Sequence, residues 1–184
     1  MSIRMLTALA VCALVIATGF NAPANAEEAA TIEKKSREAL ASLLSQSAGA
    51  KAISKDSVAV LVFPEILKGG LILGGLYGEG ALIDGGKVDG YYSTAAGSIG
   101  LQAGLQKFGY AVFFLDEDAL GYLDRSDGWE IGSAPSLVVV DEGVSGKLTT
   151  TSARERIYVF FFDQKGLMAG IGIEGNKISK ITPD

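Results

Sequence analysis

The sequence predicts an α+β protein in which a curved, mainly antiparallel β-sheet, arranged as a sandwich or a partly closed barrel, is covered by an N-terminal amphipathic helix. The sheet is indicated by short apolar runs rich in β-branched and aromatic residues, such as VAVLVF, SLVVVDE and IYVFFFD. It is also indicated by segments in which apolar residues alternate with glycine or polar residues. The helix is indicated by apolar residues at helical spacing in residues 31–46.

The first 26 residues have the features of a signal peptide. Arg4 precedes an apolar run of 16 residues, and Ala24-Asn25-Ala26 has the small-x-small pattern of a cleavage site. The run is shorter than the ~20 residues that a membrane-spanning helix needs. Cys12 follows a valine and precedes eight more residues of the apolar run, which disfavours lipid attachment at this cysteine. We therefore expect cleavage after Ala26 and export to the periplasm or the periplasmic face of the envelope.

Residues 27–184 have the length of a single domain that can bury a core. The sequence has no histidine, and cleavage would remove its single cysteine, which excludes zinc sites of Cys and His, thiol nucleophiles, disulfides and histidine bases. Without Arg4, 15 basic and 21 acidic residues leave a formal charge of −6, which disfavours nucleic acid as a partner. We expect no enzymatic activity and neither a metal nor a cofactor.

The helix predicted at residues 31–46 begins with Thr31 as the expected cap. Glu33 with Arg37, and Lys34 with Glu38, are spaced as i,i+4 ion pairs. Its apolar stripe either packs on the sheet or lies on a membrane surface. Residues 33–68 contain six basic and four acidic residues, so the front of the domain is mildly basic and the rest is acidic. The apolar residues of the stripe are Ile32, Ala39, Leu40, Leu43 and Leu44.

In at least three predicted strands of the β-rich body, residues 57–182, glycines leave one face with few side chains. These strands are GGLILGGLYGEGAL, GSIGLQAGLQ and GLMAGIGIEG. Removing the β-carbon lets a backbone, a helix or a ligand approach closely and permits sharp bending. A short helical turn is expected at DEDALGYL. In the first strand, one face is predicted to hold Gly70, Ile72, Gly74, Leu76, Gly78 and Gly80, opposite Leu71, Leu73, Gly75, Tyr77 and Glu79.

Phosphate and metal motifs fit this sequence poorly. Gly78-Glu79-Gly80 lacks the third glycine of a dinucleotide fingerprint. The match that starts at Gly170 leaves too few residues for a nucleotide-binding unit. DEDALG resembles a calcium loop at three positions, but Leu120 stands where a ligand belongs.

Several segments in order resemble the SYLF domain, a lipid-binding module of eukaryotic membrane-trafficking proteins and exported bacterial proteins. They are VAVLVFPEILKGGLILGGLYGEGAL, GYYSTAAGSIGLQAGLQ, AVFFLDEDALGYL and GLMAGIGIEGNKI, and they extend from about Leu40 to Ile181. The most specific part of the resemblance consists of Phe63, Pro64, Lys68, Gly69, Gly70, Gly74, Gly78 and Gly80.

This resemblance implies binding of phospholipid or of a membrane surface rather than catalysis. The lipid-binding residues that it implies are Lys68 and the helix face of Ile32, Leu40, Leu43 and Leu44, with Lys51 and Lys55 as weaker candidates. The acidic mature chain is poorly suited to strong electrostatic adhesion, because each basic residue near an anionic surface contributes only about 1 kcal/mol. Two alternatives remain open: an envelope scaffold or stress protein with an unknown protein partner, and a small integral outer-membrane barrel.

Overall fold

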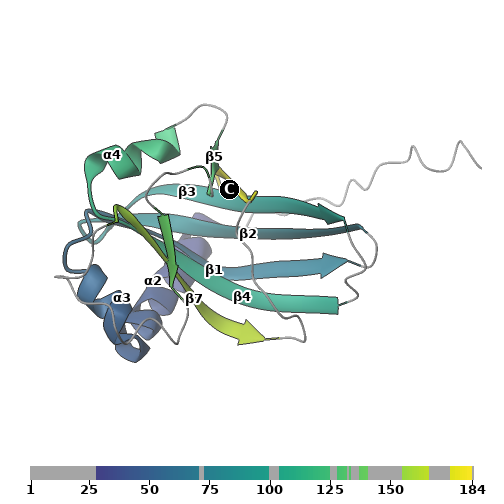
Figure 1. Cartoon of the computed structure of the whole chain (residues 1–184), viewed down its shortest axis with the longest axis horizontal. Helices are drawn as coiled ribbons and strands as arrows, with labels where there is room; N and C mark the ends of the chain where they lie inside the picture. Colours follow the sequence, from purple (N-terminus) through teal and green to yellow (C-terminus); the bar gives the residue numbers. More distant parts are fainter. Residues whose placement is uncertain are drawn as a thin grey trace, which may run out of the picture.

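A single curled β-sheet with the form of a half-barrel dominates the protein (Figure 1). The computed structural model describes residues 28–70, 73–99, 104–124, 128–131, 133, 137–140, 155–165 and 175–183. In these residues the sheet has eight strands in the order β5-β8-β3-β2-β1-β4-β7-β6. Among the strand pairs formed by the described residues, β6–β7 alone is parallel, so the sheet is mixed but mainly antiparallel. The strands are β1 (Ala59–Gly70), β2 (Leu73–Asp84), β3 (Lys87–Ile99), β4 (Gly104–Phe114), β5 (Trp129–Glu130), β6 (Leu137–Val140), β7 (Ile157–Lys165) and β8 (Lys177–Ile181).

The predicted N-terminal helix is present as α2 (Ala29–Gln46). It begins two residues before the predicted start, after Glu28, so Thr31 lies inside the first turn and the prediction that Thr31 caps the helix is wrong. A second helix, α3 (Ala48–Ile53), follows at once and is capped by Ser47, whose Oγ accepts a hydrogen bond from the Ala50 N–H. The helical turn expected at DEDALGYL is present as α4 (Glu117–Leu120) and the 3₁₀ helix η1 (Gly121–Asp124).

The chain reverses direction inside two segments that were each predicted to be one strand. β1 ends at Gly70 and β2 begins at Leu73, and across this hairpin Gly69 pairs with Gly75. In the second segment β3 ends at Ile99 and β4 begins at Gly104. Alternation by twos cannot reveal the first reversal, because residues paired across a hairpin share a face. It cannot reveal the second either, because β3 and β4 are separated in the sheet by β2 and β1, and a local pattern does not show which strands pair. The third glycine-rich strand that was predicted, GLMAGIGIEG, lies outside the described residues except at its last glycine.

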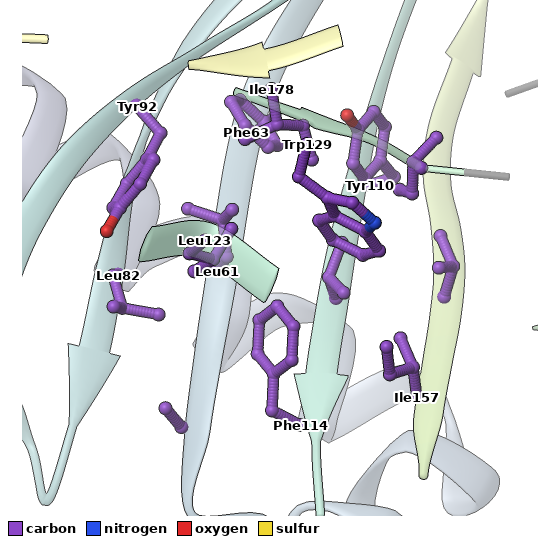
Figure 2. Packing of buried hydrophobic residues seen from close by; sticks show 14 of the residues in the cluster. Leu61, Phe63, Leu82, Tyr92, Tyr110, Phe114, Leu123, Trp129, Ile157 and Ile178 are labelled. Atoms are coloured by element: carbon purple, nitrogen blue, oxygen red, sulfur yellow. The ribbon is translucent and has the colours of Figure 1, made fainter. Parts of the chain in front are cut away.

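Apolar side chains are buried on both faces of the sheet. We call one side the Trp129 face, on which Leu61, Phe63, Tyr110 and Trp129 pack together (Figure 2). The other side, here called the helix face, buries side chains of β1, β2, β4, β6 and β7 together with residues of α2 and α3: Leu43, Ala50, Ile53, Val60, Val62, Ile83, Ala111, Phe113, Val140, Tyr158 and Phe160.

An irregularity in β1 at Phe63-Pro64 shifts its register with both neighbouring strands. Proline lacks an N–H donor and is tolerated where the ladder is interrupted. The extra residue changes which side chains face which way. As a result, Phe63 and Ile66 both pack on the Trp129 face, while Leu67 lies on the helix face.

Helix α2 contacts β1, β2 and β3. The buried Ser36 hydroxyl donates a 3.3 Å hydrogen bond to the carbonyl of Val62 in β1. Arg37 Nη1 donates a 2.9 Å hydrogen bond to the carbonyl of Gly86, in the turn between β2 and β3. The predicted pair of Glu33 with Arg37 forms at 2.8 Å. Polar as well as apolar contacts therefore attach α2 to the sheet.

Candidate functional site

The apolar face of α2, a predicted lipid-binding surface, is turned toward the protein. Ile32 is fully buried and Leu43 is 6% exposed. Leu40 and Leu44 are half-buried and pack against the apolar cluster of the helix face. All four side chains contact protein atoms, and lipid would reach Ile32 and Leu43 only if α2 left the sheet.

The predicted basic residues do not form one site. Lys51 in α3 and Lys55 in the following turn are exposed. Lys68 lies on the Trp129 face, where its register partners are Leu76 in β2 and Gln106 in β4. The helices therefore lie against one face of the sheet, while Lys68 projects from the other.

Two glycines of the segment that resembles SYLF domains allow β2 to lie close to β1. A β-carbon on Gly78 would lie 2.6 Å from the Glu65 carbonyl oxygen, and one on Gly80 would lie 2.8 Å from Cδ1 of Phe63. Real β-carbons do not approach other atoms this closely, so β1 at its irregularity leaves room only for glycine. Gly69, Gly70 and Gly74 lie where the β1–β2 hairpin ends.

Exposed apolar side chains gather at the end of the sheet away from α2 and α3, where β1 and β3 end and β2 and β4 begin (right in Figure 1). We call Leu67, Tyr77 and Leu105 the distal patch; they are 49%, 46% and 75% exposed. Leu67 and Tyr77 are register partners, and Leu105 pairs with Gly69, two residues beyond Leu67. The three side chains therefore share the helix face of the sheet as neighbours.

The polar groups beside the distal patch largely satisfy one another. Lys107 forms an ion pair with Glu65. The Tyr77 hydroxyl donates a 2.6 Å hydrogen bond to Glu79 Oε1. Burial, followed by this hydrogen bond and the charge of Glu79, raises the pKa of Tyr77 to about 12. Tyr77 is therefore uncharged at neutral pH.

A shallow pocket of ≈ 590 Å³ lies elsewhere, between the first half of α2, the β2–β3 turn and the end of β8. Its charged lining is mixed: Arg37 is already bound to Glu33, and Lys87, Asp89 and Lys180 complete it. Side chains of both signs on an open surface are typical of solvated protein. The residues that line this pocket offer no nucleophile paired with a base.

In the segment DEDALG, which resembles a calcium loop, Asp116 and Asp118 form ion pairs with Arg156. Arg156, just before β7, donates to both carboxylate oxygens of Asp116 at 2.6 and 2.7 Å and to Asp118 at 2.8 Å. Asp116 Oδ1 also accepts the Ala119 N–H at the start of α4. The Arg156 hydrogen bond is the main cause that lowers the pKa of Asp116. Within the described part of the chain, no group of three or more acidic residues is arranged to hold a metal ion.

No protein-family model matches this chain. A search of curated proteins also finds no match. Among the helices that the structure describes, none has the length and apolar character needed to cross a bilayer.

Sequence reasoning missed the distal patch. A usable signal was present, since residues 69–78 and 90–106 contain no charged residue. What the sequence did not show is that both uncharged stretches meet at one end of the sheet, which depends on the β1–β2 and β1–β4 registers.

Proposed function

We propose that this is a non-enzymatic lipid-binding protein of the bacterial cell envelope, similar to SYLF domains, that rests on a phospholipid surface. The observation that carries the proposal is the distal patch, in which Leu67, Tyr77 and Leu105 expose apolar surface together on one face. Clustered apolar side chains on a protein surface mark sites of interaction. Fully burying an exposed leucine contributes roughly 1.5–3 kcal/mol, and because Leu67, Tyr77 and Leu105 are already partly buried, their joint insertion contributes a few kcal/mol, as weak and reversible adsorption requires.

The proposal differs in one respect from the site that the sequence suggested. Helix α2 covers the sheet and remains there, because its apolar face already packs with Val60 and Val62. Lipid contact through Ile32 and Leu43 would first expose both the helix face of the sheet and the helix itself. The distal patch needs no such rearrangement.

Co-sedimentation with phospholipid vesicles tests this function. The full-length chain is expressed, and the protein is purified in the form in which it accumulates in the cell. It is then mixed with vesicles, and the amounts of bound and free protein are compared after sedimentation. We expect binding that weakens when Leu105, which is 75% exposed, is replaced by serine, with an unchanged circular dichroism spectrum. Absence of binding to every vesicle would contradict the proposal and favour a protein partner.

A further inference from the structure

We propose that the distal patch recognises the interface of an electrically neutral phospholipid bilayer, by shallow insertion of Leu67, Tyr77 and Leu105, and that it needs no anionic lipid. This inference rests on the proposed function and specifies the chemistry of its partner. It also removes any role for Lys51, Lys55 and Lys68 in the attachment.

The charges around the distal patch do not fit an anionic surface. The nearest residues with formal charge on the same face are Glu65, Glu79 and Lys107, together with Lys165, the register partner of Lys107 in β7. Further out on this face, beyond Ala95, lie Lys177 in β8 and its register partner Glu130 in β5. Lys107 is neutralised by Glu65, and Glu79 accepts the Tyr77 hydroxyl. Three lysines and three glutamates leave this part of the sheet with no net positive charge. Anionic head groups would therefore add no net attraction.

Lysines elsewhere do not change this balance. Lys68 is close in sequence but projects from the Trp129 face, where it lies beside Leu76 and Gln106. Lys51 and Lys55 belong to the α3 region, and α3 packs where β1 begins rather than where it ends. Insertion of this end of the sheet therefore keeps Lys51 and Lys55 away from the lipid surface, and the side chain of Lys68 leaves β1 on the face opposite to Leu67.

The floor of the distal patch is made of small residues. Gly69 pairs with Gly75 on the helix face, and the neighbouring strand β3 contributes Ala95 and Gly97. A β-carbon on Gly97 would meet no atom within 4 Å, so this floor is open. Leu67, Tyr77 and Leu105 therefore project above a low surface, an arrangement suited to entering a lipid interface. The shallow pocket beside the β2–β3 turn lies at the other end of the sheet.

Tyr77 is the side chain expected at the level of the head groups. Tyrosine combines an apolar ring with a polar hydroxyl and is enriched at membrane–water interfaces. Here the hydroxyl is held by Glu79 on the same strand. The ring is therefore available to lipid while its polar end already has a partner in the protein. Leu105, the more exposed of the two leucines, would reach deeper.

The test compares vesicles of phosphatidylcholine alone with vesicles that also contain phosphatidylglycerol, each at low and high salt. The protein is again obtained from the full-length chain. The variants are Leu67→Ser with Leu105→Ser, and, as a matched control, Val139→Ser, which removes an apolar side chain that is 45% exposed in β6. Near-ultraviolet circular dichroism checks that each variant retains its packed core.

We expect wild-type protein to bind both kinds of vesicle with affinities within about twofold of each other, at either salt concentration. The double variant should bind at least about tenfold more weakly, because two leucines no longer transfer into the interface. The Val139→Ser control should bind like wild type.

Three outcomes would overturn the inference. Binding only to phosphatidylglycerol vesicles, abolished by salt, would retain the proposed function but show that the partner is an anionic surface. Undiminished binding by the double variant would exclude the distal patch. No binding to any vesicle, with light scattering showing a dimer that the double variant disrupts, would overturn both proposals and assign the distal patch to a second copy of the chain.

Discussion

The Tyr110 hydroxyl in β4 donates a 2.8 Å hydrogen bond to Thr94 Oγ1 in β3, although β1 and β2 lie between these strands. Three strand spacings amount to roughly 14 Å along a flat sheet, more than the two side chains span. The bond therefore forms only because the sheet curls toward the Trp129 face. On β2, the register partner of Thr94 is Gly78, which puts no side chain in the way.

Tyr110→Phe should therefore lower the stability of the curled sheet by more than the loss of a solvent-exposed hydrogen bond would. Both hydroxyls are buried, and Thr94 Oγ1 would lose the donor that the structure gives it. We expect a loss of about 1–3 kcal/mol in the free energy of unfolding, measured by urea denaturation. Thr94→Val and the double variant complete a cycle. If the two losses simply add, the bond makes no specific contribution.

Gly80→Ala should destabilise the protein by about 1–3 kcal/mol, because the new methyl group would overlap the Val62 carbonyl and crowd the Phe63 ring. Gly97→Ala is the matched control, because a β-carbon at position 97 in β3 would have no other atom within 4 Å. Replacing this glycine should be neutral or slightly stabilising. Equal effects of the two substitutions in thermal unfolding would show that the spacing of β1 and β2 does not require Gly80.

The sequence predicts individual helices and strands better than it predicts how the strands pair. Local periodicity was sufficient for α2, and short apolar runs were sufficient for β6 and β7, because those signals depend on neighbouring residues alone. The reversal between Gly70 and Leu73 was missed because alternation continues across a hairpin. The distal patch depends on register between strands and on where α2 packs, neither of which a single sequence displays.

Asp116 should make stability depend on pH. Arg156 lowers the pKa of this carboxyl in the folded protein, so its stabilising effect is complete above the unfolded pKa of about 4 and is lost as pH falls through the lower folded value. Asp116→Asn removes the charge but keeps a residue that can cap α4. We expect a lower urea midpoint than wild type at neutral pH, and a difference that shrinks as the pH falls below about 4.

Asp84→Asn provides the control for this titration. Asp84 is exposed at the end of β2 and has no ion pair with any described residue. Its replacement should leave the urea midpoint unchanged across the same pH range. A constant difference between Asp116→Asn and wild type at all pH values would mean that the ion pair with Arg156 is not the source of the effect.

Leu43→Ala should lower the free energy of unfolding by about 2–4 kcal/mol, because this side chain is buried among Val60, Phe113 and other residues of the helix face. Lys51→Ala, a change at an exposed position in α3, should have little effect. Urea denaturation of the two variants decides whether α2 is an integral part of the core. Equal stabilities would indicate that α2 is only loosely attached.

Hydrogen exchange in the presence of phosphatidylcholine vesicles should show that α2 stays on the sheet. Release of the helix would expose Ile32 and Leu43, with the apolar side chains beneath them, and would break the hydrogen bond from Ser36 to Val62. Insertion through Leu105 and Tyr77 involves none of these groups. We therefore expect the amide exchange rates of residues 29–46 to be unchanged by vesicles, while amides of residues 74–80 and 104–110 exchange more slowly. Faster exchange in residues 29–46 would instead mean that the helix leaves the sheet to meet the membrane, because α2 would then lose the packing on β1 and β2 that stabilises its own backbone hydrogen bonds.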